Sequence, residues 1–155
     1  MTSKTDLDYI IHSLVAAARE IKEGNGDHYT HRFPVAENHD TWSFAGSYLN
    51  RGDRLVLLHH EKQEPVACLL CRITSSAMSE IYKEAVGSID LCWVEPEYRN
   101  TGIAGELVKN AEAWFMKKGI KIVELSYMAK NQGAAQVWEK LYYRPFRVYA
   151  YKKLK

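Results

Sequence analysis

The sequence lacks any long apolar run. No stretch approaches the roughly 20 apolar residues that a membrane-spanning helix requires, and the first eight residues, MTSKTDLD, lack the apolar segment of a signal peptide. The sequence also lacks an excess of either charge, because 21 basic and 19 acidic side chains give a formal net charge of +2. Such a balance carries no electrostatic signature of nucleic-acid binding. We therefore expect a cytoplasmic protein with neither a nucleic acid nor a membrane as partner.

Cysteine is scarce, with three residues in the chain. Cys68 and Cys71 have the C-x-x-C spacing of redox pairs, but a redox pair places its first cysteine at a helix N-terminus. These two lie in an apolar, strand-like run, where residues three apart point to opposite faces and sit about 10 Å apart, beyond disulfide reach. The sequence thus predicts free, buried thiols.

The spacing of His28 and His31 could suit a metal, but no third ligand follows in pattern, so we expect no metal site.

Two phosphate-binding motifs are also missing. The chain has no G-x-x-x-x-G-K-[ST] loop and no G-x-G-x-x-G after a strand. Neither a nucleoside triphosphatase nor a dinucleotide-dependent enzyme of the usual kind is therefore supported.

The elements that are present fit one α/β domain spanning residues 1–155. Apolar residues at helical spacing predict helices, and β-rich apolar runs predict strands. The expected order is a helix over 7–21, a helix over 40–49, strands over 54–60, 66–73 and 86–94, a helix over 102–118, a strand over 121–125, a helix after Asn131 and a last strand over 146–154. Strands 54–60 and 66–73 should form a hairpin, and the helix over 102–118 should make a β-α-β crossover.

The strand over 86–94 alternates in character. Alternation should place its side chains on two faces, with Ile89, Leu91 and Trp93 on one and Ser88, Asp90 and Cys92 on the other.

The stretch from Cys92 to Leu107 has the layout of a backbone anion site. An apolar strand ends at Val94, a turn containing Pro96 follows, and a loop containing Gly102 leads directly into an amphipathic helix. Free N–H groups of a turn and of a first helical turn point the same way, and the helix dipole adds positive potential there. A phosphate group fits such a site.

Three patterns in this region occur in a fixed order. They are V-x-P-x-Y-R from Val94 to Arg99, R-x-x-G-x-A from Arg99 to Ala104, and N-x-x-A-x-x-x-W from Asn131 to Trp138. Over roughly residues 54–154 the chain resembles the GCN5-related N-acetyltransferase (GNAT) family. The resemblance implies a central mixed β-sheet with splayed strands, flanked by about four helices, and acetyl-CoA as co-substrate.

The resemblance also implies how acetyl-CoA is held. Loop amides would bind the pyrophosphate, the backbone at the end of the strand over 86–94 would bind the pantetheine arm, and Asn131 would lie near that arm. The implied cofactor-binding residues are Trp93, Val94, Arg99, Asn100, Thr101, Gly102, Ile103, Ala104, Gly105, Asn131 and Trp138.

The chain departs from the family pattern in two ways. Trp138 stands where the family usually has a tyrosine that protonates the leaving thiolate. Tyr142, Tyr143 and Tyr127 are substitute candidates for the acid, although the favoured role of each is that of a packing aromatic. The family normally opens with a β-strand, and this chain opens with a predicted helix.

The expected reaction is transfer of an acetyl group from acetyl-CoA directly to a primary amine in a ternary complex. An amine with a pKa near 10.4 is only about 0.04% neutral at pH 7, so a base should assist. Asp90 is the candidate base, and its alternative role is to pair with a nearby arginine.

We expect a small-molecule acceptor, bound by segments 28–48 and 74–85. A protein N-terminal or lysine acetyltransferase and a non-catalytic acyl-CoA-binding module are the alternatives. The absence of an acidic cluster does not favour a polycation such as an aminoglycoside, and a homodimer stays open.

Overall fold

The computed structural model describes residues 4–32 and 36–154. Its centre is a mixed sheet with the strand order β1-β2-β3-β4, made of β1 (Arg54–Glu61), β2 (Glu64–Ser75), β3 (Ala85–Val94) and β4 (Val123–Leu125). The β1–β2 and β2–β3 pairs are antiparallel, whereas β3 and β4 run parallel. The predicted hairpin and the predicted parallel crossover are therefore confirmed.

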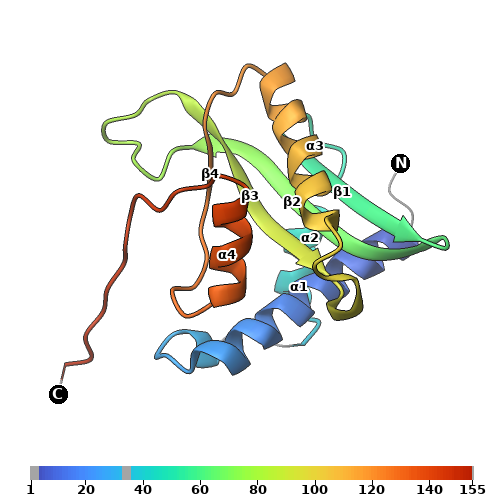
Figure 1. Cartoon of the computed structure of the whole chain (residues 1–155), viewed down its shortest axis with the longest axis horizontal. Helices are drawn as coiled ribbons and strands as arrows, with labels where there is room; N and C mark the ends of the chain where they lie inside the picture. Colours follow the sequence, from blue (N-terminus) through green and yellow to red (C-terminus); the bar gives the residue numbers. More distant parts are fainter. Residues whose placement is uncertain (1–3, 33–35, 155) are drawn as a thin grey trace.

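Four α-helices cover this sheet in the described part of the chain (Figure 1). They are α1 (Lys4–Asn25), α2 (His39–Gly46), α3 (Ile103–Lys117) and α4 (Gln132–Lys140), with short 3-10 turns η1 (Thr30–Arg32) and η2 (Pro96–Tyr98). Asn38 caps α2, because its side chain accepts from the Thr41 amide at 3.0 Å. Asn131 caps α4 in the same way through the Ala134 amide, also at 3.0 Å.

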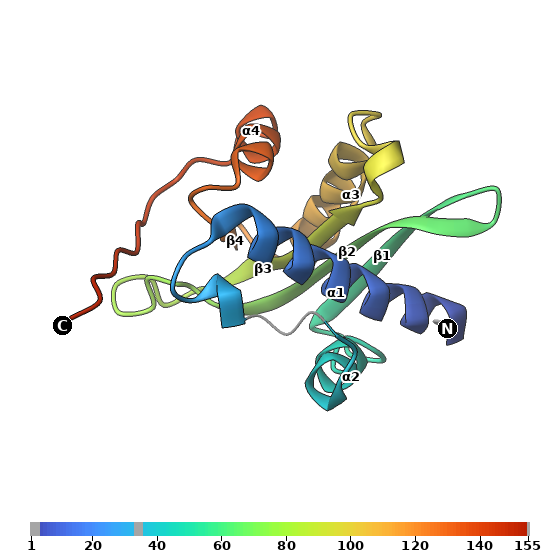
Figure 2. The same ribbon diagram turned by 90° about the horizontal axis from the view of Figure 1, so that it is seen from below.

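The sheet separates two apolar cores. Helices α1 and α2 pack on the face that carries Cys68 and Leu70, whereas α3 and α4 pack on the face that carries Leu69 and Cys71. Figure 2 shows α3 and α4 together on one side of the sheet, with α2 on the other. All three thiols are free, and the two cysteines of the C-x-x-C sequence lie on opposite faces, as their spacing predicted.

A β-bulge interrupts β3 at Asp90. Leu70 of β2 faces Leu91, and the next residue, Cys71, faces Ile89, so Asp90 is an extra residue on β3. An extra residue exchanges the faces beyond it, and Ile89 therefore packs with the α3 core while Leu91 packs with the α1 core. The prediction that Ile89, Leu91 and Trp93 share one face was wrong for this reason.

The two ends of the chain differ from the sequence-based expectation. The described residues contain no strand before β1, so the opening strand of the family is absent from this part of the chain. The strand predicted over 146–154 is also absent: these residues pair with no strand of the described chain, and Val148 and Tyr149 are 86% and 79% exposed. β4 has three residues and offers little edge on which a further strand could pair.

Gly87 provides a test of how tightly α3 packs on β3. A Cβ atom at this position would lie 2.6 Å from the fully buried ring of Phe115. We expect Gly87→Ala to lower the free energy of unfolding by about 1–3 kcal/mol through overpacking. Gly46→Ala is the matched control, since a Cβ there meets nothing within 4 Å and lies in α2, where alanine is the better helix former. Urea denaturation should give opposite signs for the two variants, and equal values would contradict this packing.

Candidate active site

The connection between β3 and α3 takes a conformation that few sequences allow. Asn100 has φ 62° and Gly102 has φ 93°, so two left-handed residues flank Thr101 just before α3 begins at Ile103. Asparagine and glycine are the residue types that adopt this conformation most readily. The Thr101 hydroxyl donates to the Tyr98 carbonyl at 2.6 Å and fixes the turn from inside.

This connection leaves a row of amide groups free. No side chain caps the start of α3, and the first helical hydrogen bond is from the Glu106 amide to the Gly102 carbonyl at 3.1 Å. Within the described chain, none of the amides from Asn100 to Gly105 donates to a protein acceptor. A Cβ at Gly102 would meet nothing within 4 Å, so the loop is open on that side. Free amides at a helix N-terminus favour an anion, as the sequence suggested.

The Arg99 side chain turns away from these amides. Its Nε donates to the Val94 carbonyl at 3.0 Å, and its terminal nitrogens bind both carboxylate oxygens of Glu20 on α1 at 3.1 and 2.7 Å. The guanidinium also lies 4.8 Å from the centre of the Trp93 ring. Arg99 is therefore positioned to fix the loop against α1, and an anion in the loop would meet backbone groups first.

Glu95 makes a second connection between the loop and α1. Its Oε1 atom accepts from the Tyr9 hydroxyl and the Trp93 indole, each at 3.0 Å, and lies 3.0 Å from His12 Nε2. The carboxylate and burial together raise the pKa of Tyr9, with burial as the larger cause. Sequence reasoning could not supply these partners of Glu95, because Tyr9 and His12 precede it by 86 and 83 residues.

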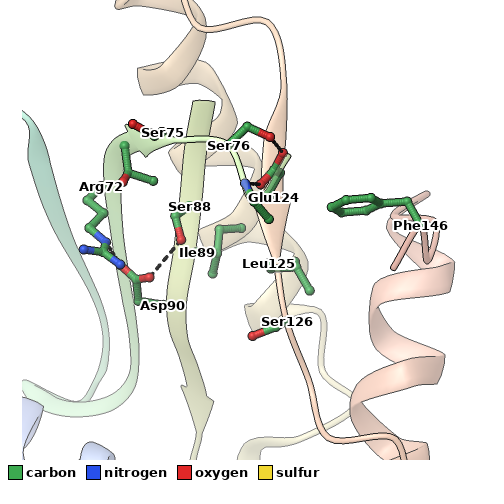
Figure 3. Close-up of a pocket in the computed structure, with 12 residues that line it drawn as sticks. Arg72, Ser75, Ser76, Ser88, Ile89, Asp90, Glu124, Leu125, Ser126 and Phe146 are labelled. Atoms are coloured by element: carbon green, nitrogen blue, oxygen red, sulfur yellow. Dashed lines mark hydrogen bonds and ion pairs between the residues drawn. The ribbon is translucent and has the colours of Figure 1, made fainter. Parts of the chain in front are cut away.

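The sheet opens between β3 and β4. The two strands pair only from Gly87 to Ile89 and from Val123 to Leu125, although β3 continues to Val94. Figure 3 shows the chain after Leu125 moving away from β3. The edge of β3 beyond the bulge thus faces a gap between the strands, which is the splay that the sequence led us to expect for a pantetheine arm.

A polar cavity of about 330 Å³ lies where the strands separate (Figure 3). Hydroxyl groups dominate its lining, and an ion pair, a carboxylate and a few apolar side chains complete it. The lining residues are Arg72, Thr74, Ser75, Ser76, Ala77, Ser88, Ile89, Asp90, Glu124, Leu125, Ser126 and Phe146. Of the two segments predicted to bind the acceptor, 74–85 contributes residues 74–77. Segment 28–48 contributes none, and its residues 33–35 lie outside the described residues.

Asp90 sits in this cavity because the bulge turns it there. Its Oδ2 atom accepts from the Tyr48 hydroxyl and lies 3.0 Å from Arg72 Nε, while its Oδ1 atom accepts from the Ser88 hydroxyl at 2.8 Å. The contact with Arg72 is an ion pair without aligned hydrogen-bond geometry. Burial and Asp90, in that order, raise the pKa of Tyr48, which keeps the Tyr48 hydroxyl protonated. The arginine partner that we named as the alternative role for Asp90 is thus present.

Glu124 is a cavity residue that the sequence analysis missed. Its Oε1 atom accepts from the Ser76 hydroxyl, and its Oε2 atom accepts from the Ala77 amide at 2.7 Å. It faces Ser88 across the β3–β4 pair. The only sequence signal for Glu124 was an acidic residue in the strand after the crossover helix. The turn whose Ala77 amide binds its carboxylate lies 47 residues earlier in the chain.

The remaining predicted residues lie away from this cavity. Trp138 is buried against Tyr143, with ring centres 5.4 Å apart. The Tyr143 hydroxyl donates to Glu112 at 2.9 Å, and burial, followed by that carboxylate, raises its pKa. Tyr142 is 88% exposed. The structure does not bring Tyr142 or Tyr143 to the cavity lining, and as proton donors both stay predictions.

Burial makes all three thiols poor nucleophiles. It raises the pKa of Cys71 and of Cys92 to about 12, and it raises that of Cys68 as well. We expect iodoacetamide at pH 8 to leave the native thiols unmodified and to alkylate all three after denaturation, as mass spectrometry would show. Because the unfolded thiols ionise first, stability should also fall as pH rises above about 9. Rapid alkylation of the native protein would contradict this burial.

The sequence comparison identifies the family. The sequence model of the acetyltransferase (GNAT) family matches residues 18–143, most of the chain. This chain belongs to the GNAT family. Over 78 residues it is also 32% identical to an uncharacterized N-acetyltransferase of Methanocaldococcus jannaschii. That match covers 50% of this chain and 34% of the relative, so the chain spans about a third of the curated relative it matches.

Solved structures share the GNAT fold seen here. A Bacillus halodurans protein has a TM-score of 0.81 at 13% identity, covering 97% of this chain and 94% of that one. The aminoglycoside acetyltransferase AAC(6')-Iy with a bisubstrate analogue has a TM-score of 0.73 at 16% identity, covering 98% and 94%. An aminoglycoside 6'-N-acetyltransferase of Acinetobacter haemolyticus has a TM-score of 0.68 at 17% identity, covering 90% and 93%. The TM-scores show a shared fold, and at sequence identities this low they show the fold alone. No helix in the described part of the chain is long and apolar enough to cross a membrane.

Proposed function

We propose that the protein transfers an acetyl group from acetyl-CoA to a small primary amine. The observation that carries this proposal is the continuity of two sites along β3. The free amides from Asn100 to Gly105 lie beyond its end, and the cavity around Asp90 lies at its bulge. A bound acetyl-CoA would place its pyrophosphate on the amides and its pantetheine arm along the open edge between them, with the thioester near the cavity.

Transfer would be direct. The amine, once neutral, attacks the thioester carbonyl, a C–N bond forms and the C–S bond breaks. The extra proton on the nitrogen then passes to the departing CoA thiolate. A covalent acetyl-cysteine intermediate would need a thiolate, and the raised pKa of Cys92, the thiol closest in sequence to Asp90, argues against one. Both substrates must then be bound together.

Asp90 is the proposed acceptor of the amine proton. Its Oδ2 atom is occupied by Arg72 and Tyr48, whereas Oδ1 has one protein donor, Ser88, and retains a lone pair for a group in the cavity. The CoA thiolate is a fair leaving group, so transfer can proceed without an enzymatic acid. Asn131 would contact the pantetheine arm through its amide nitrogen, because its side-chain oxygen caps α4.

A small-molecule acceptor is favoured over a protein one by the shape of the site. The cavity is at the lower end of the size range of small-molecule pockets, and hydroxyl groups line it from β2, β3, the turn after β2 and the segment after β4. Thiol release from acetyl-CoA, followed across a panel of small amines and of peptides with free N-termini and lysines, tests the proposal. Release with small amines supports it, and release confined to peptides would favour the protein acetyltransferase.

The rival from another class is an acyl-CoA-binding module without catalysis. The replacement of the usual tyrosine by Trp138 favours this candidate. Calorimetric binding of CoA together with background thiol release for every acceptor would select it. Failure to bind CoA at all would reject both.

A further inference from the structure

Glu124 differs in charge balance from the other carboxylate of the cavity. Asp90 is paired with Arg72, the one basic residue of the lining. None of the ion pairs in the described residues involves Glu124. Glu124 therefore carries a negative charge with no ion-pair partner in the described residues, and the Arg147 guanidinium beside it is directed at the Ala77 carbonyl, to which it donates at 2.6 Å.

The setting of Glu124 leaves it able to bind a cation. The Ser76 hydroxyl and the Ala77 amide each occupy one lone pair, one on each carboxylate oxygen, and hold the group in a fixed orientation. Each oxygen keeps a further lone pair. Ser88 lies opposite Glu124 on β3 and is hydrogen-bonded to Asp90, so an ammonium at Glu124 lies next to the proposed base.

The rest of the lining is neutral. Hydroxyl groups come from Thr74, Ser75, Ser76, Ser88 and Ser126, and Phe146 from the C-terminal segment supplies an aromatic wall. Hydroxyls can both donate and accept, which suits the alcohol or amide groups of a polar ligand. A second or third ammonium group would find no unpaired carboxylate here and would have to be desolvated without compensation.

We propose that Glu124 binds the ammonium group of the acceptor, and that this acceptor is a small monoamine bearing hydroxyl or amide groups, such as an amino alcohol or a monoamino sugar. The inference rests on the proposed acetyl transfer and deepens it. It separates this chain from its structural relatives that act on aminoglycosides, which are polycations. Glu124 attracts the cation, and Asp90 then takes its proton.

The experiment compares acceptors and variants by steady-state kinetics at fixed ionic strength. For the wild type, kcat/KM for a monoamino sugar should exceed that for sisomicin. Glu124→Gln should raise KM for the monoamino sugar about 10–100-fold, as expected for loss of a charge-assisted hydrogen bond, with little change in kcat. Glu61→Gln is the control, since Glu61 is exposed, pairs with His59 and lies outside both the cavity and the segments predicted to bind the acceptor. It should leave both constants unchanged.

The outcomes distinguish this inference from the proposed function. Acetyl transfer that is faster with sisomicin, or an unchanged KM in Glu124→Gln, would overturn the inference and leave acetyl transfer standing. CoA binding without transfer to any amine would overturn both. The acceptor comparison needs only the wild type, so an unstable Glu124→Gln variant would not rescue a wrong assignment.

Discussion

Gly102→Glu is expected to raise the dissociation constant for acetyl-CoA by at least about 100-fold. The new carboxylate would project from the open side of the loop, within the stretch of free amides from Asn100 to Gly105. It would compete for those amides and repel the pyrophosphate, and like charges in contact cost several kcal/mol, with each 1.4 kcal/mol worth a factor of ten. Isothermal titration of CoA into the purified variant measures the loss directly.

The substitution has a structural cost that must be separated from the electrostatic one. A side chain at φ 93° adds strain of about 1–2 kcal/mol. Gly119→Glu provides the matched control, because Gly119 ends α3 with φ 77°, and a Cβ there also meets nothing within 4 Å. Both variants should lose similar stability, and only the variant at Gly102 should lose CoA. Unchanged affinity in Gly102→Glu would refute the placement of the pyrophosphate.

The glycine-containing loop before α3 could be predicted from sequence because its signal is local. Gly102, the helix that follows and the strand that precedes lie within one continuous stretch, and Gly102 and Gly119 bound α3 with the left-handed conformations that glycine favours. The order of strands and helices follows from hydrophobic periodicity, which is also local. These features predicted the β1–β2 hairpin and the crossover, whereas the splay was implied by the family resemblance.

The features that sequence reasoning missed depend on pairs of distant segments. A bulge is defined by two strands, and the exchange of faces at Asp90 becomes visible only once β2 is set beside β3. Glu95 and Arg99 obtain their partners from α1, and Glu124 obtains its donors from the turn after β2. The 146–154 segment has the alternation of a strand, but three-residue β4 gives it little to pair with. Each of these features depends on contacts between distant segments and not on local propensity.

Asp90→Asn is expected to lower kcat/KM for an alkyl amine by about 10²–10⁴-fold, the usual contribution of a general base. Asparagine keeps the size of the side chain, and its one oxygen can accept from Ser88 or from Tyr48, but it cannot take a proton. Affinity for CoA should stay within about twofold, because the free amides of the loop lie beyond the far end of β3. Asp53→Asn, which removes an exposed pair with Arg51, is the control for loss of an ion pair alone.

The pairing of Asp90 with Arg72 allows a purely structural role, and the choice of acceptor separates the two. A base matters most when the acceptor arrives protonated, as an alkyl amine does at pH 7. An acceptor whose nitrogen is already neutral at that pH, such as a hydrazide, needs no such help. If Asp90 takes the proton, the loss of activity in Asp90→Asn should be large for the alkyl amine and small for the hydrazide. An equal loss for both acceptors would mean that Asp90 serves to hold Arg72, Tyr48 and the bulge in place, and that the proton leaves by another route.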